Sequence, residues 1–178
     1  MIYDGNLNTA EQEIHALEHE VAVLLDAEGN GLLRFGGNRS NVLVTIPDGV
    51  AEGKIFTHNH PSGRTFSNQD IANFCGGRFL EARVCTPNGV LYSLKIASDA
   101  PAWSMGESML AEGIGSALRA AELMREQLSK GAYSYEYMME NYEKIRCDAQ
   151  GMDVHNWLTE NAEKFGFAYR KGVLRHEG

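Results

Sequence analysis

The sequence predicts a mixed α/β protein of the α+β class, in which a sheet-containing domain is followed by a helical extension. Residues 1 to about 100 alternate short apolar runs with turn signals, whereas β-branched residues become rare from Pro101 onward. The 178 residues suffice for one domain with a full core and an appendage. We therefore expect residues 1–100 to form the domain and residues 101–178 to form the helical extension.

The first half of the domain is expected to contain a helix followed by four strands. The segment that starts at Thr9 and reaches Gln12 has capping-box spacing, which predicts a helix from about Thr9 to His19. Apolar runs of strand length, separated by turn residues, predict the strands. In order, these strands are residues 21–25, 32–35, 42–46 and 54–57.

The second half of the domain is expected to contain a helix and a hairpin. Ser67 can cap a helix over residues 68–79. Residues 83–86 and 90–96 then flank an Asn-Gly pair, which is typical of the tight turn of a β-hairpin. In the extension, apolar residues recur near helical spacing. They predict helices from about Ile114 to Leu128, ending near Gly131, from Tyr133 to Cys147, and from Asp153 to Phe165.

The composition argues against several classes of partner. The formal net charge is −8, which is poorly suited to gripping a phosphate backbone, so no nucleic-acid partner is expected. No apolar run approaches the ~18 residues of a membrane helix, so no membrane partner is expected either. The N-terminal residues lack a basic start and an apolar core, and the three cysteines match no CxxC pattern. We therefore expect a cytoplasmic protein.

The residues that carry chemistry lie at the end of the strand predicted at residues 54–57. His58 and His60 stand at positions i and i+2, so both side chains project to the same side. Asp70, one turn into the next helix, could return a carboxylate to the same point. Two histidines and one carboxylate leave a fourth position for water, which is what a catalytic zinc needs. The sequence thus predicts a zinc site.

A zinc-bound water needs a general base, and the candidates are Glu18 and Glu20, which lie beside the apolar run at residues 21–25. Ser67 could donate a hydrogen bond to a developing oxyanion. Each feature also has a plainer interpretation. Ser67-x-x-Asp70 has the form of a capping box, a His-x-His pair is often two polar loop residues, and either glutamate could simply be solvated.

Taken together, these residues resemble the JAMM metalloprotease motif of the JAB/MPN domain family. The family pattern is an upstream Glu, His-x-His, a short spacer and Ser-x-x-Asp. Here it reads Glu20 (or Glu18), His58-Asn59-His60 and Ser67 to Asp70. The sequence THNHPSG at residues 57–63 is most similar to the bacterial and phage RadC-like branch of this family. The resemblance covers about residues 10–97, with a spacer one residue shorter than is common in the family.

This resemblance implies a JAB/MPN-like (cytidine-deaminase-like) mixed sheet flanked by helices. It also implies a zinc metallopeptidase or isopeptidase, with Zn²⁺ held by His58, His60 and Asp70. Glu20 would take the proton of the water and later give it to the leaving amine, while Ser67 and the metal share the oxyanion. Glu20 is preferred over Glu18 because it immediately precedes the apolar run. The implied substrate is a bacterial or viral protein or peptide.

Two alternatives to this hydrolase remain open at this point. The first is a non-catalytic or processing JAB-fold scaffold or assembly factor of phage or mobile-element origin. The second is a nucleic-acid-linked role, which the net charge of −8 disfavours. The helices expected in residues 101–178 could cover the sheet, hold a substrate against the metal, or form a homo-oligomer interface.

Overall fold

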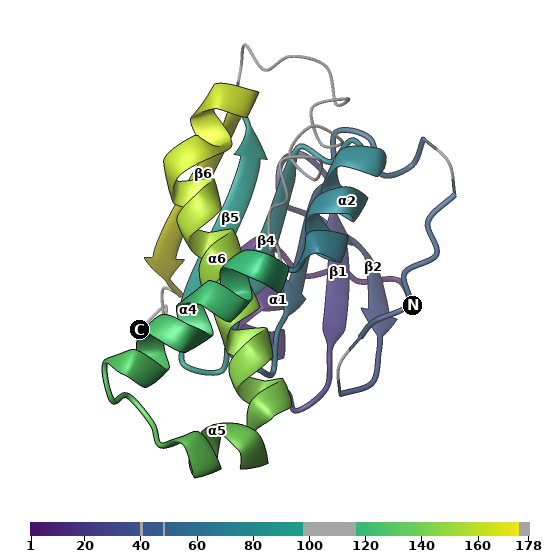
Figure 1. The fold of residues 1–178 in the computed structure, drawn as a ribbon. Helices are drawn as coiled ribbons and strands as arrows, with labels where there is room; N and C mark the ends of the chain where they lie inside the picture. Colours follow the sequence, from purple (N-terminus) through teal and green to yellow (C-terminus); the bar gives the residue numbers. More distant parts are fainter. Residues whose placement is uncertain (40, 48, 98–116, 175–178) are drawn as a thin grey trace.

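The computed structural model describes residues 1–39, 41–47, 49–97 and 117–174 of the chain. They form one six-stranded sheet and the helices that cover it (Figure 1). The strands are β1 (Val21–Leu25), β2 (Gly31–Gly36), β3 (Ile55–Asn59), β4 (Glu81–Cys85), β5 (Val90–Ile96) and β6 (Phe167–Val173). The helices are α1 (Leu7–Ile14), α2 (Asn68–Gly76), α4 (Ala117–Ser129), α5 (Tyr135–Glu140), α6 (Tyr142–Asn161) and the short 3-10 helix η1 (Ala162–Phe165).

The strands lie side by side in the order β2-β1-β3-β4-β5-β6. β3 and β4 are parallel, and every other neighbouring pair is antiparallel. A parallel pair needs a crossover connection, which α2 provides here. The loop from β3 to α2 therefore brings the end of β3 and the first turn of α2 to the same edge of the sheet. The expected class, a mixed sheet flanked by helices, is confirmed.

Alternate residues of β1 pack on opposite faces of the sheet, so two apolar clusters hold the helices. Leu24 belongs to the cluster that contains Ile71 of α2 and Leu158 of α6. Leu25 belongs to the cluster on the other face, together with Ile14 of α1. β1 is thus buried on both faces, which explains its uninterrupted apolar sequence. α4 packs on α6 through a third, smaller cluster.

Two helices differ from their predicted limits. α1 starts two residues earlier than expected, because the Asn6 side chain accepts hydrogen bonds from the backbone N–H of Thr9 at 2.9 Å and from its hydroxyl at 3.1 Å. Asn6 is therefore the N-cap, and the prediction of a capping box beginning at Thr9 is wrong. α1 also ends at Ile14 rather than His19, and α2 ends at Gly76 rather than at residue 79.

The strand expected at residues 42–46 does not form. Both edges of β1 and of β3 are already paired with described strands, and at the outer edge of β2 the N–H of Arg34 donates to the carbonyl of Met1 at 2.8 Å. Residues 42–46 therefore find no free strand edge on β1, β2 or β3, the strands that are closest to them in the sequence. Leu43 is 84% exposed. Val44 lines a cleft and does not pair with a neighbouring strand.

The expectation that residues 101–178 hold only helices is wrong for β6. This strand pairs antiparallel with β5 over its whole length, from Phe167 opposite Ile96 to Val173 opposite Val90. Gly166, with φ at 76°, takes the left-handed conformation that ends η1 and lets the chain turn into the strand. Most of β6 is exposed, so its sequence lacks a strong apolar alternation.

The break between the last two predicted helices also lies elsewhere than expected. It falls at Asn141, and α6 then runs without interruption through Gly151 for 20 residues. Gly151 packs against the side chain of Arg64, where an added Cβ would lie 3.4 Å from the Arg64 Cβ. None of the described helices, α6 included, is long and apolar enough to cross a bilayer. The domain boundary expected near residue 100 and the predicted helix start at Ile114 lie outside the described residues.

We expect Leu158→Ala to lower the free energy of unfolding by about 2–5 kcal/mol, as large-to-small core substitutions do. Leu158 is fully buried in the cluster that holds α6 on the sheet. Urea unfolding followed by circular dichroism measures the change. Leu43→Ala, at an exposed position, serves as the matched control and should stay within about 0.5 kcal/mol of the unsubstituted chain. Equal small losses in both variants would contradict this packing of α6.

Candidate metal centre

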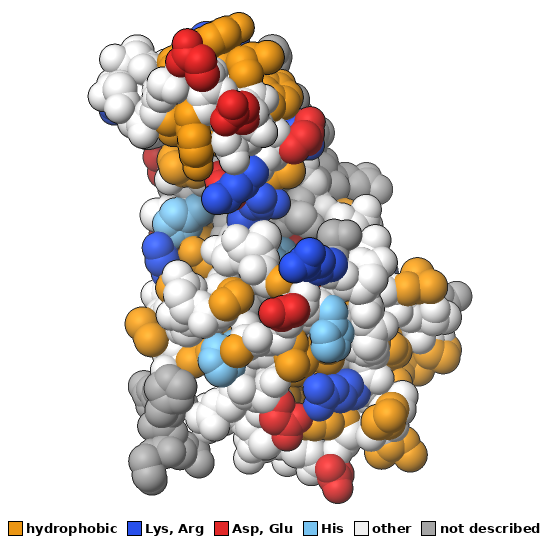
Figure 2. All heavy atoms as spheres, turned by 90° about the horizontal axis from the view of Figure 1, so that it is seen from below, with side chains coloured by type: hydrophobic (Ala, Val, Ile, Leu, Met, Phe, Trp, Pro, Cys, Tyr) orange, Lys and Arg blue, Asp and Glu red, His pale blue; other side chains and the backbone are white. Residues whose placement is uncertain are grey.

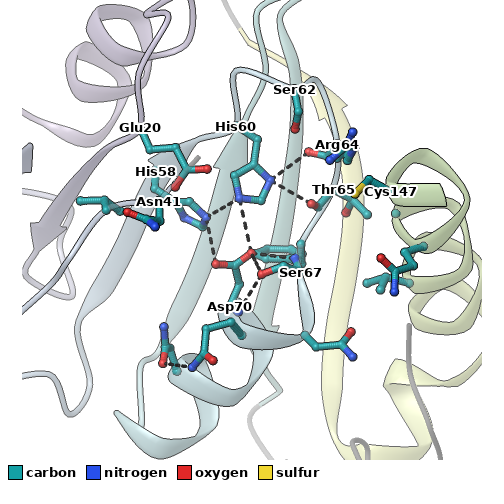
Figure 3. Close-up of a pocket in the computed structure, with 18 of the residues that line it drawn as sticks. Glu20, Asn41, His58, His60, Ser62, Arg64, Thr65, Ser67, Asp70 and Cys147 are labelled. Carbon is teal, nitrogen blue, oxygen red and sulfur yellow. Dashed lines mark hydrogen bonds and ion pairs between the residues drawn. The ribbon is translucent and has the colours of Figure 1, made fainter. Parts of the chain in front are cut away.

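His58, His60 and Asp70 meet at the edge of the sheet where β3 ends (Figure 3). The Nε2 atoms of the two histidines lie 3.0 Å apart. Asp70, in the first turn of α2, places Oδ1 3.2 Å from Nε2 of His58 and Oδ2 3.4 Å from Nε2 of His60. His58 is 2% exposed and His60 is 8% exposed. The three predicted ligands thus form one largely buried cluster that could hold a metal ion.

The spacing within the cluster fits a small metal ion. With metal–ligand bonds of about 2.0–2.1 Å in a tetrahedron, neighbouring ligand atoms lie about 3.3 Å apart. One ligand atom from each of the three residues lies within 4.8 Å of the others. The two Nε2 atoms lie 3.0 Å apart, and each lies 3.2 or 3.4 Å from a different oxygen of Asp70. Two unprotonated Nε2 atoms at such a distance would repel each other unless a cation or a proton lay between them. Zinc, iron and manganese all accept this set of nitrogen and oxygen donors, so the ligands support a metal without fixing its identity.

The two histidines are held differently. Nδ1 of His60 lies 2.9 Å from the backbone oxygen of Thr65 and 3.3 Å from that of Arg64. Because a carbonyl only accepts, Nδ1 of His60 carries the proton and donates, and the Nε2 lone pair is left free for a metal. Nδ1 of His58 is buried and has no hydrogen-bond partner among the described residues. His60 is therefore the ligand whose orientation is fixed by an outer hydrogen bond.

Asp70 is oriented by Ser67, the N-cap of α2. The backbone N–H and the hydroxyl of Ser67 donate to Asp70 Oδ2 at 2.6 and 2.7 Å, and the Asp70 N–H donates to the Ser67 oxygen at 3.2 Å. This reciprocal arrangement is a capping box, so the plainer interpretation of these two residues is confirmed. The same contacts turn the carboxylate toward the histidines. The role of Ser67 as an oxyanion donor stays a prediction.

The charges of the cluster stabilise one another. Burial alone would raise the pKa of Asp70, but the charges and hydrogen bonds of His58 and His60 hold it well below its usual value. Burial alone would lower the pKa of His60, but Asp70 and, more weakly, Glu20 raise it. The pocket thus favours a negative carboxylate beside positive charge. A metal cation would take the place of imidazole protons and release them.

Glu20 faces the histidines across the cleft, whereas Glu18 does not. Glu20 immediately precedes β1, and β1 pairs with β3, so its carboxyl group reaches the metal cluster (Figure 3). The side chain is half-buried, and this burial raises its pKa, against the opposing effect of the two histidines. A carboxylate with a raised pKa is suited to proton transfer. Glu18 is exposed and does not line the cleft.

Asn59, which the sequence analysis did not single out, fixes the turn that carries Glu20. Its side-chain oxygen accepts from the N–H of Val21 at 2.7 Å, and its amide donates to the carbonyls of Leu17 at 3.2 Å and His19 at 3.0 Å. The strand period could have indicated this role, because the residue between two histidines that face the metal must point to the other side.

The metal cluster lies in an open cleft of about 530 Å³. Its lining on one side includes Glu20 and the extended segment that contains Val44, and on the other side it includes residues of α6. α6 is also tied to the loop after β3, because Nε of Arg64 donates to Asp148 Oδ1 at 2.9 Å. The α6 residues that line the cleft are Cys147, Gln150, Gly151 and Val154. No local pattern marked them, because their partners in the cleft lie about eighty residues or more away in the sequence.

Comparisons with models of protein families, with curated proteins and with solved structures found no match. The resemblance to the JAB/MPN family therefore rests on the motif residues and on the order of the elements. The geometry of the cleft is the basis for the function proposed next.

Proposed function

We propose that this protein is a zinc-dependent hydrolase of the JAMM type that cleaves a peptide or isopeptide bond. The observation that carries the proposal is the convergence of four side chains in one cleft: the cluster of His58, His60 and Asp70, and the carboxyl group of Glu20 that faces it. Two imidazoles and one carboxylate leave a zinc position open for water. A half-buried carboxyl group beside that position is suited to take the proton of the water.

The order of the elements supports membership of the JAB/MPN family and of its RadC-like branch. Helix α1, the β1–β2 hairpin, β3, the metal loop, α2 and the β4–β5 hairpin follow one another as the resemblance implies. The spacer between His60 and Ser67 is one residue shorter than is common in the family. It lies entirely in the loop between β3 and α2, where changes of length are tolerated, and the three ligands still converge.

The proposed chemistry is hydrolysis with a single water. Zinc, when bound, lowers the pKa of a water toward ~7 and polarises the carbonyl of the scissile bond. Glu20 accepts a proton from the attacking water and gives it to the amine nitrogen as the C–N bond breaks, which leaves a carboxylate and an amine. Ser67 turns its hydroxyl from Asp70 to the oxygen that gains negative charge and stabilises it by a hydrogen bond.

The shape of the surface supports a protein or peptide substrate. A second cleft of about 760 Å³ adjoins the first, and both are lined by Val44, Phe56 and Asn73. Together they form an open groove, as a length of extended polypeptide requires. On the face shown in Figure 2, positive and negative side chains are interspersed, which suits a polypeptide better than a phosphate backbone. We propose a bacterial or phage protein as the source of the substrate.

A reducing compartment is consistent with the cysteines, so we place the protein in the cytoplasm. All three cysteines are free, and Cys75 and Cys85 are buried. Burial raises the pKa of Cys75 to about 11, so its thiol stays protonated and unreactive at neutral pH.

The zinc-loaded chain is expected to hydrolyse members of a mixed library of peptides and isopeptide-linked peptides. Mass spectrometry in ¹⁸O-labelled water would detect one labelled oxygen in each new carboxyl group. A chelator should reduce cleavage to background, and zinc should restore it, because the proposed hydrolysis depends on the metal. A chain that holds zinc and cleaves nothing would contradict the proposal and favour the non-catalytic scaffold.

A further inference from the structure

The loop between β3 and α2, which contains the ligand His60, makes a side-chain contact with β6. Oγ1 of Thr65 lies 3.0 Å from the phenolic oxygen of Tyr169 in β6, and that oxygen lies 2.8 Å from Nδ1 of His155 in α6. Thr65 and Tyr169 are 104 residues apart in the sequence. A chain of hydrogen bonds therefore connects β6 and α6, the elements that close the described chain, with the loop between β3 and α2.

Thr65 is also the residue that fixes the orientation of His60. Its backbone oxygen lies 2.9 Å from Nδ1 of His60 and accepts that proton. The outer hydrogen bond of a ligating histidine sets its tautomer and the direction of its ring. Any rotation of Thr65 would therefore change where Nε2 of His60 points. Thr65 thus forms a hydrogen bond to the ligand His60 through its backbone carbonyl and another to Tyr169 through its hydroxyl.

The surroundings of Tyr169 hold its hydroxyl in place. Thr65 is 4% exposed, and the ring of Tyr92 is stacked on that of Tyr169 with centroids 6.5 Å apart and planes at 10°. Burial raises the pKa of Tyr169, so the phenol keeps its proton at neutral pH. Burial, together with the charge of Lys171, lowers the pKa of His155, so its ring is neutral there. The contact between Tyr169 and Thr65 is therefore an ordinary hydrogen bond that persists at neutral pH.

We propose that Tyr169 is a positioning residue for the metal ligand His60 and that it acts through Thr65. This inference rests on the proposed function, because it assigns Tyr169 a role toward the metal. It also means that β6 contributes to the metal centre, in addition to the α6 residues that line the cleft. Because Tyr169 does not contact His60 itself, removal of its hydroxyl weakens metal binding and distorts the site without abolishing it.

Tyr169→Phe removes only the hydroxyl and tests the proposal directly. We expect zinc affinity, measured by competition with a chromogenic chelator, to fall about 10-fold, the lower end of the range for outer hydrogen-bond partners of metal ligands. The visible absorption bands of the cobalt(II)-substituted chain should shift as the coordination geometry changes. Thr65→Val should reproduce both effects, and Thr65→Ser, which keeps a hydroxyl, should restore the affinity and the spectrum.

Tyr92→Phe is the matched control. Tyr92 stacks on the same ring, and its hydroxyl has no hydrogen bond within the described part of the chain. Equal metal affinities in the two Phe variants, or equal impairment in Thr65→Ser and Thr65→Val, would overturn the inference. If Tyr169→Phe does not fold, the comparison of Thr65→Ser with Thr65→Val tests the proposal in its place. If the unsubstituted chain binds neither cobalt nor zinc, the proposed function fails as well; if it binds metal and the variants match it, only the positioning role fails.

Discussion

Replacing His58 or Asp70 with alanine is expected to remove bound zinc, from about one ion per chain to none. Each side chain supplies one of three ligand atoms that lie within 4.8 Å of one another. Loss of an outer hydrogen-bond partner already costs about 10–100-fold in metal affinity, so loss of a ligand should cost more than about 100-fold. Metal content by mass spectrometry would measure this on protein purified without added metal or a polyhistidine tag.

The controls separate loss of the metal from loss of the fold. Asp70 takes part in the capping box with Ser67, so Asp70→Asn, which keeps an acceptor oxygen, accompanies the alanine variant. His19→Ala and Asp4→Ala remove the same groups at exposed positions away from the cluster and should retain zinc. No zinc in the unsubstituted chain, and no uptake when zinc is added, would rule out the metal centre. So would alanine variants that still carry the ion.

The ligand cluster could be predicted from the sequence because its members are close along the chain. His58 and His60 share one strand end, where the period of two residues fixes their direction. Asp70 lies in the first turn of the helix that follows, and only the loop between β3 and α2 separates it from them. The position of Glu20 depended on one further condition, the pairing of β1 with β3, which the structure contains.

The two incorrect predictions that concern strands share one physical cause, which is that a strand needs an open edge. Residues 42–46 have the apolar, β-branched composition of a strand, but β1 and β3 already pair with described neighbours on both sides. β6 has a weaker apolar pattern, yet it forms a strand because the outer edge of β5 is available. Edge availability is a property of the assembled sheet. It therefore could not be deduced from either segment alone.

The same cause explains why the sequence analysis did not identify the residues of α6 and β6 that contribute to the site. α6 lines the cleft, and the phenol of Tyr169 reaches Thr65, only because β6 docks on β5 and α6 covers the face that contains Leu158. These contacts depend on packing between parts of the chain about a hundred residues apart. A short motif can thus identify the reacting groups, whereas the groups that orient them become visible only in the folded chain.

Glu20→Gln is expected to lower kcat/KM by about 10²–10⁴-fold for any peptide that the zinc-loaded chain cleaves, which is the usual contribution of a general acid–base group. Gln keeps the size and polarity of the side chain but cannot accept a proton from water. Glu20 is not one of the three clustered metal ligands, so zinc content should stay that of the unsubstituted chain. This combination, retained metal with lost turnover, separates proton transfer from metal binding.

Glu18→Gln provides the matched control, because it makes the same change two residues away on an exposed side chain that does not line the cleft. Its kcat/KM should remain within about 2-fold of the unsubstituted chain, as expected for a surface position that contacts no reacting group. Equal turnover in both variants would remove Glu20 from the proposed chemistry. A large loss in Glu18→Gln alone would instead make Glu18 the base and would require the turn before β1 to rearrange when substrate binds.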